Sequence, residues 1–215
     1  MVPFFTPFLF TKKLSVKSNS LDVDIIGAVH SPFTNTTIDS LYIADNVTKL
    51  PPYLLSRVNG MTSVTLGGGL TSVSEMLFVD NTVIEEVILN ENITSIESHA
   101  FSGCTSLKQV VGISRIKTIE GWAFSGCKSF KYIDLSNVES LGAAFSSSGL
   151  EQVILPDKLE VIPASCFAGC KIKNITLPDG LKTIEESAFA ASAIESIVIP
   201  DSVTTLEWYA FRYCK

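Results

Sequence analysis

The chain has 215 residues, of which 46% are hydrophobic and 18% are charged, and its formal net charge is −6. This hydrophobic fraction is enough for a continuous core and excludes a disordered chain, which carries few apolar and many charged residues. The negative balance, without a basic stripe, argues against a nucleic-acid partner, because such binding requires cations that neutralise phosphates.

The opening stretch MVPFFTPFLF is apolar and is followed by Lys12 and Lys13. A secretory signal places its positive charges before the apolar run and ends it with a small-residue cleavage site. Here the order is reversed, and Pro3 and Pro7 interrupt the run. We therefore expect an ordered or frayed terminus, with a cleaved signal as the alternative. No run reaches the roughly 18 apolar residues that indicate a membrane-spanning helix.

A repeat of 22 or 23 residues then occupies the chain, with a degenerate first unit at 16–37. Clear units begin at residues 38, 61, 84, 107, 130, 150, 172 and 194, and the unit at 130–149 is two residues short. If the first residue of a unit is offset 0, large apolar residues recur at 0, +3, +5, +9 and +12, and a small residue followed by Phe stands at +16/+17. Such a period indicates a solenoid, in which each unit contacts only its neighbours. We predict two parts: 1–37 as an N-terminal capping segment with the degenerate repeat, and 38–215 as the solenoid.

Each unit contains the pattern of one strand. Offsets 0 to +5 alternate, with +3 and +5 facing the core and +2 and +4 facing solvent. Leu-Pro-Asp or Ile-Pro-Asp at +5 to +7 of the last three units ends the strand, because Pro has no N–H for the ladder. We expect offsets +9 and +12 to supply a second apolar wall, and the Ala-Phe pair to form one short helical or 3-10 turn. Stacking of the units then gives a parallel sheet.

The five cysteines occupy fixed places in the repeat. Cys104, Cys127, Cys170 and Cys214 share offset +20, and Cys166 stands at the small-residue offset. Neither spacing matches the paired Cys-x-x-Cys of a zinc site. We interpret them as small apolar side chains that fill one column of the core. A disulfide or a reactive role is the alternative, because neighbours in a stack can approach bridging distance.

The repeat resembles the BspA-like, or Treponema-type, class of leucine-rich repeat. The resemblance rests on the L-x-x-I-x-I-P-x-x-V-x-x-I core followed by A-F-x-x-C, as in IESIVIPDSVTTLEWYAFRYC and LEQVILPDKLEVIPASCFAGC, and it covers residues 38–215. It implies an α/β repeat fold: a right-handed leucine-rich-repeat solenoid with a parallel β-sheet on one face and short helical or 3-10 turns opposite.

The resemblance also implies a function. Members of this family look like surface or secreted adhesion and recognition modules that bind host matrix proteins or other cells. The expectation is a non-enzymatic module, at a cell surface or secreted, that binds a protein or glycan partner through the exposed face of its sheet. An intracellular protein-protein interaction scaffold of the same fold is the alternative. The oligomeric state is left open.

The sequence offers little for catalysis or for holding a cofactor or a metal. The only histidines are His30 and His99, and neither belongs to a recognisable motif. Gly67-Gly68-Gly69 lacks the Lys-Ser/Thr of a phosphate loop and falls where other units turn. Carboxylates scattered over exposed offsets are interpreted as a solvated face and not as a calcium site: Glu85, Glu86 and Glu91. We therefore predict no catalytic, cofactor-binding or metal-binding residues.

Two rows of outward side chains are candidates for partner binding. The first is on the sheet face: Tyr42, Ile88, Val111, Tyr132, Ile154 and Val198. A strip of exposed apolar side chains usually marks a contact surface, although β-branched residues also simply suit strands. The second is an aromatic ridge at offset +15: Tyr53, Met76, His99 and Trp122. Aromatic residues and Met are enriched where proteins recognise one another.

Four Asn-x-Thr sequons are also present, at Asn35, Asn46, Asn92 and Asn174. They would carry glycans only if the chain passes through a secretory pathway that performs this modification.

Overall fold

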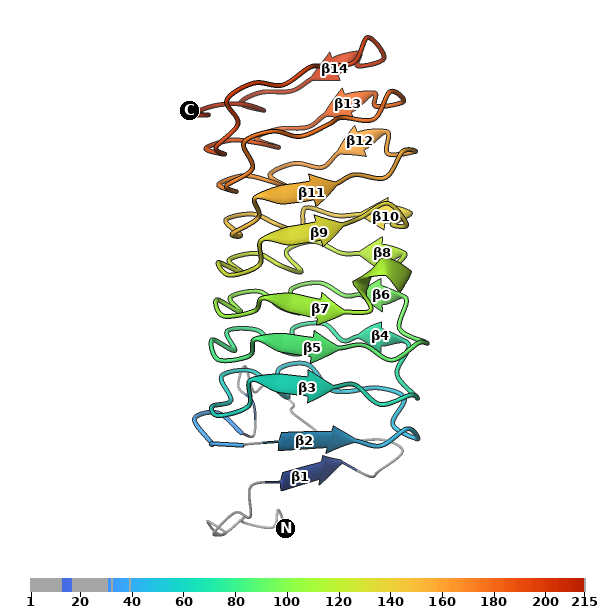
Figure 1. The fold of residues 1–215 in the computed structure, drawn as a ribbon, viewed down its shortest axis with the longest axis vertical. Helices are drawn as coiled ribbons and strands as arrows, with labels where there is room; N and C mark the ends of the chain where they lie inside the picture. The colour runs from blue at the N-terminus through green and yellow to red at the C-terminus, as the bar shows by residue number, and fades with distance from the viewer. Residues whose placement is uncertain (1–12, 17–30, 32, 39, 215) are drawn as a thin grey trace.

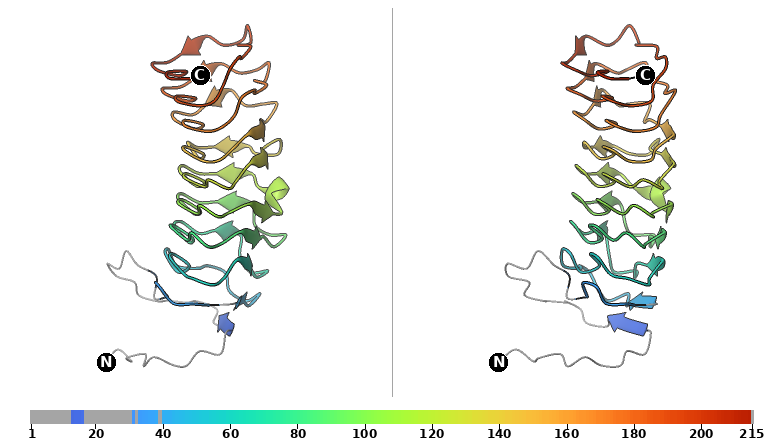
Figure 2. Two further views of the ribbon diagram at one scale, coloured as in Figure 1. Left: turned by 60° about the vertical axis from the view of Figure 1, so that its left-hand side comes forward. Right: turned by 90° about the vertical axis from the view of Figure 1, so that its left-hand side faces the viewer.

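The computed structural model describes residues 13–16, 31, 33–38 and 40–214 (Figure 1). Most of the expected degenerate unit at 16–37 lies outside the described residues, and so does His30. The described chain is wound into coils that stack along one long axis, as Figures 1 and 2 show from three directions. This is the solenoid that the repeat predicted, and its strands pair in parallel.

A front row of strands occupies the predicted offsets from Ser40 onward. The strands are β1 (Lys13–Val16), β2 (Ser40–Ile43), β3 (Ser63–Thr65), β5 (Glu86–Ile88), β7 (Gln109–Val111), β9 (Tyr132–Asp134) and β11 (Gln152–Ile154). The prediction that Val16 begins a unit is wrong. Val16 pairs with Ile43 at offset +5, because the Leu-Ser-Val alternation at 14–16 matches offsets +3 to +5 of the next coil.

A second row of strands, which the repeat analysis did not predict, runs along the back of the coils at offsets +11 and +12, or +10 and +11 in the short unit. Its members are β4 (Ser72–Val73), β6 (Ser95–Ile96), β8 (Thr118–Ile119), β10 (Ser140–Leu141), β12 (Val161–Ile162), β13 (Thr183–Ile184) and β14 (Thr205–Leu206). The second apolar wall is therefore also a hydrogen-bonded ladder. In Figure 1 its arrows point against those of the front row, because each coil returns along its opposite side.

Both rows are interrupted once. The front strands form one sheet of order β1-β2-β3-β5-β7 and a second pair, β11-β9. The back strands form a sheet of order β10-β8-β6-β4 and another of order β12-β13-β14. The front ladder therefore breaks between β7 and β9, and the back ladder breaks between β10 and β12, one coil later. Figure 1 shows both gaps. The short unit at 130–149 lies between them.

A column of stacked phenylalanine rings runs through the coils without interruption. Adjacent centroids are 5.2–5.7 Å apart along Phe78, Phe101, Phe124, Phe145, Phe167, Phe189 and Phe211. The first six are fully buried, and Phe211 is partly buried. The phenylalanines of successive coils therefore lie in one interior file.

The corner that carries these rings is a run of tight turns rather than a helix. In the coil of Phe101, the backbone N–H groups of Ala100, Ser102 and Cys104 each donate to the carbonyl three residues earlier. The one helix among the described residues is a 3-10 helix, η1 (Ile113–Arg115), which follows Gly112 on another side of the coil. The expected helical turns at the Ala-Phe corner are not confirmed. The right-handed sense of winding stays a prediction.

Candidate ligand-binding surfaces

The six front-face residues predicted to bind a partner are spread over separate parts of the front row. Tyr42 lies in β2, opposite Thr65 of β3, and only its backbone is described. Ile88 and Val111 are paired neighbours in β5 and β7, half-buried and 44% exposed respectively.

The other three candidates lie beyond the break in the front ladder. Tyr132 of β9 and Ile154 of β11 are 51% and 47% exposed. Val198 is 84% exposed and lies outside the named strands. The structure thus brings Ile88 and Val111 together and places Tyr132 and Ile154 on a second ladder.

The break in the front ladder has a local cause. Gly112 follows β7 with a φ of 91°, a left-handed value that glycine adopts readily, and η1 begins at the next residue. In three other coils the residue at offset +5 donates its N–H to the next strand: Leu66 donates to Ile88, Leu89 to Val111 and Leu135 to Ile154. Gly112 makes no such bond within the described residues.

The ridge at offset +15 has an unusual backbone. Tyr53, Met76, His99 and Trp122 all have φ between 53° and 62°, and Ser165 and Ser187 have similar values in later coils. Large side chains are rarely placed in this left-handed region, at a cost of roughly 1–3 kcal/mol each. The turn itself requires only a residue that tolerates positive φ, as the two serines demonstrate. The large side chains on the ridge are therefore not required by the fold.

Contacts within the ridge join neighbouring coils. The rings of His99 and Trp122 stack with centroids 6.1 Å apart, and the Oγ of Ser98 lies 2.8 Å from Nδ1 of His99. Trp122 is exposed, whereas the other three members are half-buried. Trp122 is therefore the ridge side chain that is most exposed to solvent.

A second aromatic group, around Trp208 and Tyr213, was missed. These side chains are 78% and 71% exposed, and Arg212 lies 4.5 Å from the ring centroid of Tyr213 and 4.6 Å from that of Tyr209. Such contacts between a cation and an aromatic face are attractive. The signal was present in the sequence, because Trp208 stands at offset +14, where other coils carry small or polar residues.

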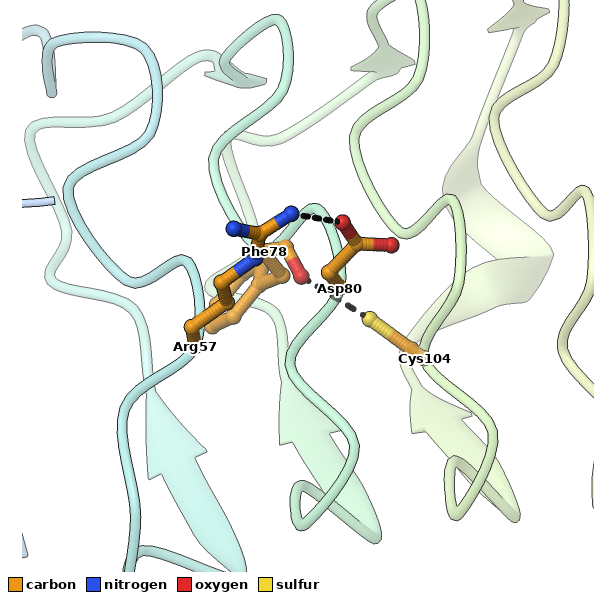
Figure 3. A network of polar contacts seen from close by, with 4 residues as sticks. All are labelled: Arg57, Phe78, Asp80 and Cys104. Carbon is orange, nitrogen blue, oxygen red and sulfur yellow. Dashed lines mark hydrogen bonds and ion pairs between the residues drawn. The ribbon is translucent and has the colours of Figure 1, made fainter. Parts of the chain in front are cut away.

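The column of cysteines is structural. The five cysteines all lie in the described part of the chain and form no disulfide. The Sγ of Cys104 donates to the carbonyl of Phe78 in the preceding coil at 3.1 Å, as Figure 3 shows beside the Arg57–Asp80 ion pair. Cys127 repeats the bond to Phe101 at 3.1 Å. The column is therefore polar as well as space-filling, because each thiol satisfies a carbonyl inside the core.

Burial also disfavours the reactive thiolate form of Cys104, Cys127 and Cys166. Removal from water raises the pKa of both Cys127 and Cys166 to about 12 and raises that of Cys104 well above its usual value. A nucleophilic cysteine needs the opposite, a lowered pKa and access to solvent.

The glycine run at 67–69, the remaining candidate for a ligand site in the sequence, has a structural role in a turn. Gly68 and Gly69 lie in a turn as expected, and a Cβ on Gly67 or Gly69 would come 2.3 Å from a backbone oxygen of the preceding coil. Among the described residues, no three His, Cys, Asp or Glu side chains are grouped to hold a metal ion. That same part of the chain contains no helix with the length and apolarity to cross a membrane.

Comparison with known proteins agrees with this geometry. The family model described as a BspA type leucine rich repeat region matches residues 25–144 and 142–215, in six copies. A search of curated proteins found no match.

Two solved structures illustrate the likeness. A leucine-rich repeat protein from Bacteroides ovatus is 28% identical, with a TM-score of 0.67, over 75% of this chain and 43% of that one. A leucine rich cell surface protein from Faecalibacterium prausnitzii is 23% identical, with a TM-score of 0.54, over 78% of this chain and 41% of that one. The match thus spans less than half the length of either protein.

Proposed function

The chain belongs to the BspA-type leucine-rich repeat family, and from that premise we propose that it is a non-enzymatic recognition module that binds a protein or glycan through its front face. The fold is one that generally serves protein interaction or adhesion. The proposed contact residues are Tyr42, Ile88, Val111, Tyr132, Ile154 and Val198.

One observation carries this proposal. Val111, Tyr132 and Ile154 expose about half of their side chains although their backbones are fixed in parallel ladders. Because the backbone beneath these side chains is already ordered, a partner that covers them does not have to order it, so such a surface is prepared for binding. Tyrosine is also enriched in protein interfaces.

The ridge of Tyr53, Met76, His99 and Trp122 is a second candidate surface of the same module. Its support is the left-handed backbone beneath all four side chains, a conformation that a serine occupies in other coils. Strain of this kind is often retained at binding sites. A Trp122→Ser variant separates the two surfaces, because it removes the exposed ridge and leaves the front face intact.

We further propose that the module acts at a cell surface or is secreted. The side chains of the sequon residues Asn35, Asn46, Asn92 and Asn174 are all exposed, as glycan attachment requires. The alternative is an intracellular scaffold that binds through the same face. Fractionation of the native cells, with a glycosidase mobility shift, distinguishes these two possibilities.

The binding face is tested by charge substitution. Ile88, Val111 and Ile154 are replaced together by Lys, and the chain is used to capture partners from the surface of the native cells. We expect capture to be lost while the circular dichroism spectrum and melting temperature are kept. The matched control places Lys at three exposed threonines elsewhere on the coils: Thr71, Thr94 and Thr204. Capture that survives the front-face change would show that the site is wrong.

A further inference from the structure

A cleft of about 840 Å³ opens on the back of the solenoid where β10 and β12 fail to pair. Its walls come mainly from the coils of β10 and β12 and include Glu139, Leu141, Lys158, Glu160 and Val161. The volume lies within the range of roughly 300–1,000 Å³ that is typical of ligand sites. Figure 1 shows β10 and β12 separated along the back row, on the side away from the proposed front-face contacts.

Pro163 explains why the back ladder stops here. At this offset, +13, Glu97, Glu120, Glu185 and Glu207 each donate their backbone N–H to the back strand of the preceding coil. Glu120, for example, donates to the carbonyl of Ile96 at 3.0 Å. Pro163 has no N–H, so the corresponding bond to Leu141 cannot form.

The glutamate side chains contribute a second link that is missing at the cleft. Glu97, Glu120, Glu185 and Glu207 each accept a backbone N–H at offset +14 of the preceding coil, such as that of Ser98 at 2.9 Å from Glu120. Pro163, which stands at this offset beside the cleft, has no carboxylate to offer. The opening between β10 and β12 is therefore encoded by the sequence.

The segments of β10 and β12, on opposite sides of the cleft, have complementary unpaired backbone groups. On one side, the carbonyls of Glu139 and Leu141 accept no N–H within the described residues. On the other side, the N–H groups of Glu160 and Val161 have no acceptor in that part of the chain. In the next coil, Lys182 and Thr183 fill the equivalent places by donating to the carbonyl of Glu160.

The charged side chains that line the cleft favour a ligand of one sign of charge. Lys117 is paired with Glu139 at 2.9 Å, so those two charges offset each other. Asp157, Lys158 and Glu160 form no ion pair in the described chain, and the carboxylate of Glu185 is a further negative charge at the rim. The unpaired excess is negative.

We propose that this cleft binds an extended peptide with basic side chains, which enters as a strand between β10 and β12. Running parallel to both strands, the peptide donates N–H groups to the carbonyls of Glu139 and Leu141 and accepts from the N–H groups of Glu160 and Val161. This is strand addition, in which main-chain bonds supply affinity and side chains supply preference. A lysine or arginine on the solvent side meets Asp157 or Glu160.

The test begins with a random heptapeptide library selected against the full chain. We expect enriched peptides to alternate branched apolar residues with Lys or Arg, and a synthetic copy to bind in fluorescence anisotropy. Backbone N-methylation of that copy at alternate residues should weaken binding at least tenfold. If no peptide binds below about 1 mM, or if N-methylation has no effect, the proposal is overturned.

Variants then locate the site. Pro163→Glu restores the N–H and the carboxylate found in other coils, so it should close the cleft and weaken binding at least tenfold. Glu160→Lys should weaken binding several-fold, and the control Glu186→Lys, exposed outside the cleft, should not. If P163E does not fold, E160K and the N-methylated peptide decide the question.

Equal binding by E160K and E186K would show that the peptide binds elsewhere. A homodimer that P163E dissociates would overturn the peptide proposal and identify a second copy of this chain as the occupant.

Discussion

The rings of Phe145 and Phe167 stack with their centroids 5.7 Å apart and 2° between their planes, although the same two coils are unpaired at the back of the solenoid. The corner keeps its own bonds, since the N–H of Phe145 donates to the carbonyl of Cys166 at 3.0 Å. The ring column and the strand ladders are thus separate sources of cohesion, and a ladder opens without breaking the core.

Phe167→Ala should lower the free energy of unfolding by about 3–5 kcal/mol, because it leaves a cavity between two stacked rings. Phe211→Ala is the control, since that ring contacts one ring neighbour and is only partly buried. Urea denaturation followed by circular dichroism measures both variants. If both variants lower the free energy of unfolding equally, a ring stacked on both faces contributes no more stability than a ring stacked on one face.

The interior of the fold was predictable from the sequence because it repeats. A Phe stands at +17 in every full-length unit from residue 61 onward. These rings must fall in one file if the units stack, and Phe101, Phe124 and Phe189 do so. The back strands were not predictable in this way, since Ser95–Ile96 has two residues and shows no alternation to count. The ladder at that site depends on the neighbouring coil and not on local pattern.

The candidate surfaces were predictable only in part. Alternation indicated that Val111 and Ile154 point outward, and both are exposed. It could not show that the ladder breaks between their strands, because that depends on the left-handed conformation of Gly112. Pro163 was visible in the sequence, but its effect became clear only beside the N–H groups that glutamates donate in other coils.

Gly149→Ala should destabilise the chain by about 1–3 kcal/mol, as overpacking does in a close contact. A Cβ at Gly149 would lie 1.9 Å from the carbonyl oxygen of Lys128, which is backbone and cannot simply rotate away. Gly180→Ala is the control, because nothing lies within 4 Å of its Cβ position. Thermal melting should separate the two variants, and similar melting temperatures would contradict this close approach.

Glu97→Ala should lower the free energy of unfolding by about 1 kcal/mol, a modest loss because the site is only partly buried. Its carboxylate accepts the hydroxyl of Ser72 at 2.6 Å and the N–H of Glu75 at 2.9 Å, which ties two coils together. Glu97→Gln, which keeps one acceptor oxygen, should lose less. Glu91→Ala, at an exposed position, is the control for the loss of charge alone. If E91A lowers the free energy of unfolding as much as E97A does, the hydrogen bonds of Glu97 do not stabilise the fold.

Alkaline pH should unfold the chain through its buried thiols. Burial raises the pKa of Cys127 to about 12, whereas an unfolded cysteine titrates near 8.5. Between these values the folded chain keeps a proton that the unfolded chain has released, so the free energy of unfolding is unaffected by this thiol below about pH 8 and falls with rising pH above it. One thiol contributes a slope of about 1.4 kcal/mol per pH unit. Cys127→Ala should therefore be less stable at neutral pH but lose stability less steeply between pH 9 and 11, as urea titrations at each pH would measure. Parallel curves for the two proteins would mean that the Cys127 thiol is not kept protonated by burial in the folded chain.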